Sequence, residues 1–263
     1  MAGVRADLQI SQTDKVPVLT YHSIDASGSI VSVAPEVFRR QMSFLSESGY
    51  NTVSMSDLVN SLVEQKPIFP KTIALTFDDG FQNFYTTAFP ILEQCGFKAT
   101  VFLVTDFCGK TNDWADNPPQ LPPSNLLSWR EIKELNCCGI EFGAHTRTHP
   151  DLTRSSAAAA IREIVESKAV IEDSLGTAAT SFAYPYGRFN RSIRQIAEKT
   201  YRSACSTNLG KAARTSDFFA LERIDAYYLS NQKTLASLGT KNFDRYLRFR
   251  QTLRDVKSLI SRN

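Results

Sequence analysis

Thr72-Ile73-Ala74-Leu75-Thr76-Phe77-Asp78-Asp79-Gly80 is a strand-like run that ends on two adjacent carboxylates. Like charges side by side repel each other, unless a cation neutralises one of them and leaves the other free to act as a base. An isolated Asp-Asp-Gly sequence is more often a turn or a helix cap than a catalytic pair. A functional interpretation therefore depends on what accompanies these residues elsewhere in the chain.

A pair of histidines elsewhere in the chain supports a functional interpretation. His145-Thr146-Arg147-Thr148-His149 begins 66 residues after Asp79, and the sequence contains one further histidine, His22. A spacing of four residues lets both imidazoles reach one metal ion when the backbone turns helically or forms a tight loop. An Asp and two His with positions left open to water suit a divalent ion such as zinc. Together the two segments indicate a metal-dependent hydrolase.

Strand-like runs alternate with helical patterns along most of the chain. The predicted strands are 16–21, 72–77, 100–104, 140–144, 181–184, 202–206 and 221–226, and the predicted helices are 35–48, 84–95, 128–138, 155–175 and 192–200. Short apolar strands in this order favour an α/β fold, a parallel sheet or barrel with its helices outside. Catalytic residues gather at the C-terminal strand ends of such folds, where Asp78, Asp79 and His145 all fall. The irregular loop 110–124, with Trp114, is expected on the same face.

Length and composition predict one globular domain over residues 1–263, with a core of about 16–226. The net charge of +3 and the lack of any recognised binding module argue against nucleic acid as a partner. Five cysteines without C-x-x-C spacing indicate reduced thiols, and we expect Cys137 and Cys138 to pack in a helix rather than chelate a metal.

The N-terminal segment 1–15 has no apolar run of the length that a signal peptide needs, which predicts a cytoplasmic protein. A chain trimmed at its N-terminus would look the same, so the compartment stays open. The C-terminal segment 241–262 predicts a basic amphipathic helix. Two placements are open for it: against the barrel with its basic face in water, or on an anionic membrane surface as a peripheral contact.

Three motifs resemble those of one family. Thr76-Phe77-Asp78-Asp79-Gly80, His145-Thr146-Arg147-Thr148-His149 and Phe182-Ala183-Tyr184-Pro185-Tyr186-Gly187 resemble the successive motifs of the polysaccharide deacetylases, also called carbohydrate esterase family four or the NodB homology domain. The opening run 16–23 further resembles the branch that contains the poly-N-acetylglucosamine deacetylases. The resemblance covers about 16–226 and implies a distorted (β/α) barrel of about seven strands.

The resemblance also implies a role for each matching residue. Asp78 would be the general base, and Asp79, His145 and His149 would bind the metal, with zinc expected and cobalt or nickel as functional substitutes. Tyr186 would direct its backbone N–H at the oxyanion. The third motif of the family usually carries an arginine that pairs with the base, but this chain has Ala183 there. Arg223 is a candidate replacement.

His22 is the expected general acid, because the C-terminal Leu-x-His motif that supplies this histidine in most of the family is missing here. Proton accounting agrees: two histidines are committed to metal, and a departing amine needs a proton donor whose pKa lies near neutral. For this role the 16–21 strand has to lie beside the strand ending at Asp78, with the imidazole across the metal from Asp78. The alternative is a hydrogen-bonded core histidine.

These observations predict a hydrolase that removes N-acetyl groups from an N-acetylated amino sugar or polysaccharide, with a glycan or a lipid-linked sugar as its substrate partner. Two alternatives stay open. One is an amidohydrolase of the same fold that acts on another acyl group, such as that of a lipid-linked formamido sugar. The other is a catalytically silent glycan-binding module, against which the retained Asp78, Asp79, His145 and His149 argue.

Overall fold

Strand β4 (Thr72–Phe77) shows how this sequence forms a barrel, because successive side chains point to opposite sides of it. Ile73, Leu75 and Phe77 belong to the apolar layer under the surrounding helices, whereas Ala74 belongs to the cluster inside the barrel. The same alternation carries Asp78 inward at the end of the strand. The computed structural model describes residues 13–115, 117, 121 and 123–260.

Seven parallel strands close into a barrel in the order β2-β10-β8-β7-β6-β5-β4, and β4 pairs back with β2. A three-residue strand, β3, pairs with the first half of β4, and β5 pairs with the second half. This inserted strand distorts the barrel. The strands are β1 (Lys15–Val16), β2 (Val18–Tyr21), β3 (Asn51–Val53), β4, β5 (Thr100–Leu103), β6 (Glu141–Ala144), β7 (Ser181–Ala183), β8 (Ser203–Leu209), β9 (Ala212–Ala213) and β10 (Leu221–Asp225).

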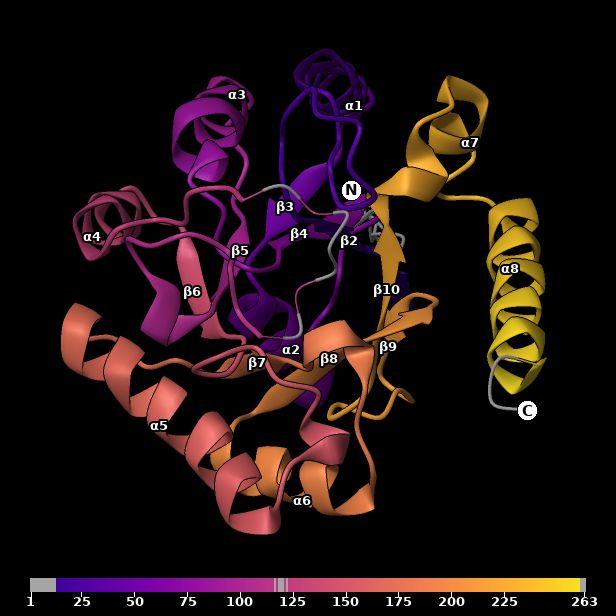
Figure 1. The fold of residues 1–263 in the computed structure, drawn as a ribbon. Helices are drawn as coiled ribbons and strands as arrows, with labels where there is room; N and C mark the ends of the chain where they lie inside the picture. The colour runs from indigo at the N-terminus through magenta and orange to yellow at the C-terminus, as the bar shows by residue number, and fades with distance from the viewer. Residues whose placement is uncertain (1–12, 116, 118–120, 122, 261–263) are drawn as a thin grey trace, which may run out of the picture.

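Helices surround the barrel (Figure 1). They are α1 (Pro35–Glu47), α2 (Met55–Val63), α3 (Phe89–Gln94), α4 (Trp129–Cys137), α5 (Ala157–Leu175), α6 (Arg191–Thr200), α7 (Gln232–Ala236) and α8 (Lys241–Ile260). Short helical turns are η1 (Phe84–Ala88), η2 (Thr105–Phe107), η3 (Leu152–Arg154), η4 (Pro185–Gly187) and η5 (Ala226–Leu229). None of the described helices has the length and apolar character needed to cross a membrane.

Two apolar layers make up most of the core, and a smaller cluster of Phe81, Val104, Trp114 and Leu126 is separate from them. The outer layer lies between the strands and the helices, and the inner one fills the barrel with side chains such as Val18, Ala74 and Phe102. The inner layer continues onto Leu58 and Leu62 of α2, so α2 closes the end of the barrel where the strands begin. The opposite end, where the strands finish, is left for the polar residues of the site.

The predicted α/β barrel of seven strands is confirmed, and the five helices predicted around it and the predicted C-terminal helix are present. The predicted 16–21 strand is interrupted, because Pro17 has no N–H to donate, and its two parts enter different sheets. The elements β3, β9, α2 and α7 were not predicted. The sequence does contain a helix pattern for α2, since Ser54 caps the helix and Met55, Leu58, Val59 and Leu62 repeat at helical spacing.

All five cysteines are free, but Cys137 and Cys138 are exposed rather than packed. Residues 1–12 of the N-terminal segment, in which no signal peptide is predicted, lie outside the described residues.

Candidate active site

Inward-facing positions of four strands meet at the C-terminal mouth of the barrel. His22 follows β2, Asp78 follows β4, His145 follows β6, and Arg223 lies on β10. They face an open pocket, except that Arg223 lies beneath it, buried behind Asp78. The pocket is lined by His22, Ile30, Val31, Asp78, Asp79, Trp114, Asn117, Leu121, His145, His149, Tyr184, Tyr186, Gly187 and Thr207. The expected site residues are therefore brought together by the fold.

Asp79, His145 and His149 form a buried group whose ligand atoms all lie within 4.8 Å of one another. The Asp79 Oδ1 atom lies 3.4 Å from His145 Nε2 and 3.3 Å from His149 Nε2. This oxygen is buried, yet it makes no hydrogen bond to any residue that the structure describes. A buried carboxylate oxygen without a hydrogen bond is costly. The donor set and the orphaned oxygen both fit a divalent metal ion.

Both imidazoles are held so that Nε2 faces Asp79. His145 Nδ1 lies 2.7 Å from the carbonyl oxygen of Ala183, to which it donates, and His149 Nδ1 lies 3.2 Å from the Tyr186 hydroxyl. Burial lowers the pKa of His149 to about 3, so this imidazole is neutral. For His145, burial lowers the pKa, but Asp79, Asp78 and the Ala183 carbonyl together raise it by more. Such partners on the second ring nitrogen orient metal-binding histidines.

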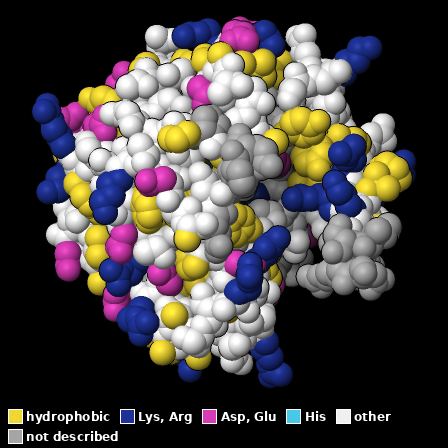
Figure 2. All heavy atoms as spheres, viewed as in Figure 1, with side chains coloured by type: hydrophobic (Ala, Val, Ile, Leu, Met, Phe, Trp, Pro, Cys, Tyr) yellow, Lys and Arg dark blue, Asp and Glu magenta, His cyan; other side chains and the backbone are white. Residues whose placement is uncertain are grey.

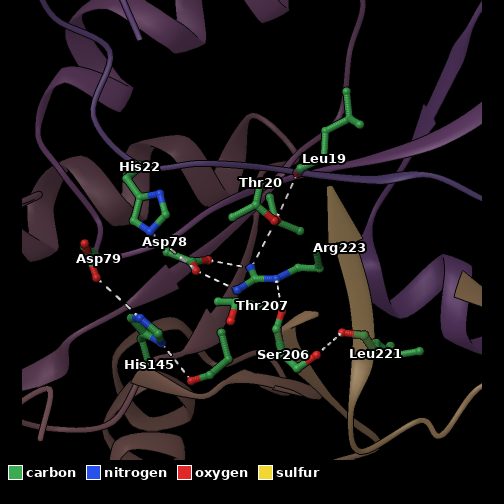
Figure 3. A network of polar contacts seen from close by, with 12 residues as sticks. Leu19, Thr20, His22, Asp78, Asp79, His145, Ser206, Thr207, Leu221 and Arg223 are labelled. Atoms are coloured by element: carbon green, nitrogen blue, oxygen red, sulfur yellow. Dashed lines mark hydrogen bonds and ion pairs between the residues drawn. The ribbon is translucent and has the colours of Figure 1, made fainter. Parts of the chain in front are cut away.

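The Asp78 carboxylate faces away from this group and pairs with Arg223 (Figure 3). Arg223 Nη1 donates to Oδ1 and Nη2 to Oδ2, each at 2.7 Å, and Nε donates to the Ser206 carbonyl at 3.0 Å. Burial by itself would raise the pKa of Asp78, but the Arg223 guanidinium, together with His145 and His22, lowers it by more, so the carboxylate is ionised. The candidate replacement for the third-motif arginine is thus in contact with the expected base.

The small side chain of Ala183 leaves room for Arg223 to take the place of the third-motif arginine. Ala183 points into the barrel on β7, in the same inner layer as Phe102, over whose ring the Arg223 guanidinium lies at 5.7 Å. A long side chain at position 183 and another at position 223 would compete for the same interior space. In this chain the arginine comes from β10 instead of β7.

His22 lies at the mouth as predicted, because β2 pairs in parallel with β4 and places Tyr21 opposite Phe77. Its Nε2 atom is 3.9 Å from Asp78 Oδ2, and the side chain is 26% exposed. The core-histidine alternative does not describe this position. The expectation that the imidazole lies across from Asp78 is wrong: β2 and β4 are adjacent strands, so the two side chains are neighbours.

Backbone strain is concentrated around the pocket. Among described residues other than glycine, six have a positive φ angle, and four of them are Asp79 (71°), Thr146 (71°), His149 (59°) and Tyr186 (57°). Left-handed backbone is unfavourable for such residues and persists only where the surroundings impose it. The strain turns Asp79 away from Asp78 and brings His149 back towards His145. The sequence gives no signal for these angles.

The loop between β6 and α5 is fixed by acidic residues of α5. Glu163 accepts hydrogen bonds from the backbone N–H of Arg147 and of Thr148, at 2.8 and 2.9 Å, and from the Thr148 hydroxyl at 2.8 Å. The Arg147 side chain pairs with Asp106 at 2.9 Å and with Glu166. Arg147 therefore helps to hold the loop that carries both histidines. The sequence indicates the loop through its two histidines, but it does not indicate that Glu163, Asp106 and Glu166 bind it.

The described part of loop 110–124 lies on the active face as expected. The ring of Trp114 is buried, and its centroid is 4.5 Å from that of His149. Asn117 and Leu121 also line the pocket. Residues 116, 118–120 and 122 of this loop lie outside the described residues.

Residues 66–203 match the polysaccharide deacetylase family. The chain is also 30% identical over 211 residues to the Bacillus subtilis protein YxkH, which is itself classed with the polysaccharide deacetylases; the match covers 80% of this chain and 71% of YxkH. The chain belongs to the polysaccharide deacetylase family. As a member it is a hydrolase, and its barrel, its motifs and their order agree with the family resemblance found in the sequence.

The chain is also similar to two further deacetylases, one by sequence and one by structure. A poly-β-1,6-N-acetyl-D-glucosamine N-deacetylase of Escherichia coli is 27% identical over 141 residues, which are 49% of this chain and 20% of that enzyme. The solved structure of the Streptococcus pyogenes deacetylase PplD in complex with acetate has a TM-score of 0.71 and 29% identity, covering 82% of this chain and 93% of that chain.

Proposed function

We propose that this chain removes N-acetyl groups from an N-acetylated amino sugar of a polysaccharide. A divalent metal ion, with zinc as the expected one, is held by Asp79, His145 and His149. Membership of the polysaccharide deacetylase family and the similarity to a poly-N-acetylglucosamine N-deacetylase support the substrate class. PplD, which is similar in fold and sequence, is described with acetate bound, and acetate is the acid that such a reaction releases.

One observation carries the proposal. A buried Asp-His-His group with an orphaned carboxylate oxygen lies directly beside a second carboxylate that is ionised and held by an arginine. A glycan-binding module would need neither the metal-binding group nor the spare carboxylate. Amide hydrolysis needs both a site for a Lewis acid and a base.

Each residue of the pocket has a distinct task in this reaction. Asp78 accepts the proton of the attacking water; each of its oxygens keeps a lone pair beyond the one that Arg223 occupies. His22 donates a proton to the departing amine, which is too poor a leaving group to depart as an anion. The Tyr186 backbone N–H is directed at the negative charge that forms on the carbonyl oxygen. A metal ion, when bound, supplies activation of the water and further stabilisation of that charge.

The Arg223 pair has a consequence for the base. It keeps Asp78 ionised in a buried position, but it also lowers the affinity of the carboxylate for a proton. His22 lies 3.9 Å from Asp78 and lowers the pKa of that carboxyl further. We propose that Arg223 and His22 together take over the tuning that the third-motif arginine provides elsewhere in the family.

Release of acetate from poly-β-1,6-N-acetylglucosamine oligomers tests the function. We expect acetate and an equal amount of free amine, loss of both with a chelator, and recovery with added zinc. Parallel reactions on formamido sugars measure formate and separate the acetyl from the formyl alternative. Full activity in protein shown by elemental analysis to be metal-free would refute the metal-dependent scheme.

A further inference from the structure

Helix α8 attaches to the barrel through one face. Phe243 and Leu247 on this face are buried, and the Gln251 side chain accepts a hydrogen bond from the Leu209 N–H at 2.7 Å. Arg254 Nη1 donates to the Thr207 carbonyl at 2.8 Å, and Lys211 pairs with Asp244 at 2.7 Å. The docked face therefore has both apolar and polar partners, and it fixes which side of the helix faces outward.

The outward side of α8 is unusual because it carries large apolar side chains. Phe249, Leu253 and Val256 are 61%, 46% and 48% exposed, and they follow one another at helical spacing on a single face. The part of the helix whose side chains are described, 241–257, contains six basic and two acidic residues, a net charge of +4, whereas the whole chain is only +3. Basic and apolar side chains are intermixed on the side of the molecule that carries α8 (Figure 2).

The docked face of α8 adjoins the wall of the active-site pocket. Thr207, whose carbonyl binds Arg254, is itself a residue of the pocket wall. The turn η5 follows directly on the C-terminal end of β10 and presents Tyr227, which is 70% exposed, at the same end of the barrel. Tyr228 of that turn lies under the Arg250 guanidinium, 5.0 Å from ring to cation. An exposed tyrosine suits a boundary between an apolar and an aqueous phase.

We propose that the outer face of α8, with Tyr227 beside it, binds the surface of a bilayer that contains anionic lipids and so holds the pocket mouth next to the membrane. Basic residues outnumber acidic ones by six to two in 241–257, which favours an anionic surface as the partner. Interfacial helices have this pattern: apolar side chains enter between the headgroups while arginine and lysine bind lipid phosphates. Positive charge on a helix that the barrel holds in place complements an anionic surface.

Co-sedimentation of the full chain with vesicles tests this proposal without any substrate. We expect binding to phosphatidylcholine vesicles that contain phosphatidylglycerol, little binding to phosphatidylcholine alone, and a decrease with added salt. The double variant Phe249→Gln/Leu253→Gln should bind these anionic vesicles on the order of tenfold or more weakly than the wild type. The control Ile161→Gln/Val165→Gln makes the same change at the same spacing on α5, where both residues are exposed, and should bind like the wild type.

A second pair of variants tests the charges. Arg245→Gln/Arg248→Gln should weaken binding to anionic vesicles by about fivefold for each arginine and reduce its salt dependence. Arg130→Gln/Lys133→Gln, with the same spacing on α4, is the control. Failure of the wild type to bind anionic vesicles at low salt, or equal binding by the α8 variants and the wild type, overturns the proposal. A dimer in sedimentation velocity that Phe249→Gln/Leu253→Gln dissociates, with vesicle binding unchanged, would assign the face to a second copy instead.

Discussion

Asp78 and Asp79 are neighbours in the chain but belong to different environments. Asp78 is the last inward position after β4 and is enclosed by the Arg223 guanidinium, whereas the positive φ of Asp79 turns its carboxylate towards His145 and His149. One carboxylate is neutralised by an arginine, and the other has a place for a cation. The repulsion expected from two adjacent carboxylates is thus relieved on opposite sides of the backbone.

Changing Asp78 to Asn should lower turnover on the order of 10²-fold or more while the protein still binds metal, because the proposed base is lost and the proposed ligands remain. The structure adds an effect on stability: Arg223 would stay buried beside a neutral amide, and breaking such a pair costs about 3–5 kcal/mol. Turnover, zinc binding and thermal unfolding measure the three effects. If metal binding were lost in Asp78→Asn and kept in Asp79→Asn, the two roles would be reversed.

Changing His22 to Ala should separate two kinds of substrate. The variant should keep its fold and its metal, since the imidazole is partly exposed. It should lose most activity on amides, because the departing amine lacks a proton donor, and lose less on an activated ester whose leaving group needs none. Rates on both substrates, measured side by side, give the result. Equal losses would mean that another group is the acid.

At the scale of elements, the site depends on how strands and helices hold the loops between them. The β6–α5 loop carries both histidines, and two of its backbone N–H groups and one hydroxyl bind a single carboxylate, Glu163 on α5. At the next motif, Gly187 has a positive φ, and a Cβ there would lie 2.1 Å from Thr207 Oγ1. Only glycine lets η4 approach β8 this closely, which places Tyr186 against His149.

Changing Glu163 to Ala should loosen the histidine loop. We expect zinc affinity to fall about tenfold, as for loss of other groups that orient metal ligands. Stability should fall by about 1–3 kcal/mol, because partly buried donors lose a charged acceptor. Zinc titration against a competing chelator and thermal unfolding measure these effects. Glu166→Ala is the matched control one turn along α5: it removes only a half-exposed ion pair with Arg147 and should change little. Equal effects of the two variants would contradict the anchoring role of Glu163.

At the scale of the whole molecule, the barrel separates stability from chemistry. Its N-terminal end is closed by α2 and is apolar, while its C-terminal mouth concentrates buried carboxylates, imidazoles and strained backbone. Such groups oppose folding unless they find partners. A ligand that binds only the folded mouth should therefore stabilise the whole barrel.

Metal removal tests this directly. Zinc at a thousand times its dissociation constant should stabilise the folded protein by about 4 kcal/mol, and a chelator should remove that gain. Thermal unfolding with and without zinc measures it. In Asp79→Asn the zinc-dependent shift should disappear, because a proposed ligand is lost. An undiminished shift in that variant would place the metal elsewhere on the chain.

The sequence by itself determined the barrel and most of the polar residues at its mouth. The alternation of side chains along β4 and β6 places Asp78 and His145 inside the C-terminal end, and local motifs bring Asp79, His149 and Tyr186 with them. These are short-range relations, fixed by the two-residue period of a strand and by turns of a few residues. Arg223 was identified only as one candidate, because a residue's strand face can be read locally but its partner across the barrel cannot.

Only the tertiary structure decided which groups meet. Closure of the barrel through the β4–β2 and β2–β10 pairings brings Arg223 to Asp78 across 145 residues and makes His22 the neighbour of Asp78 rather than its opposite. Docking of α8 through Phe243 and Leu247 decides that Phe249, Leu253 and Val256 face outward, whereas the amphipathic helix predicted from the sequence left its placement open. In each case the deciding quantity is strand register or helix rotation, which many weak contacts set together and no single motif encodes.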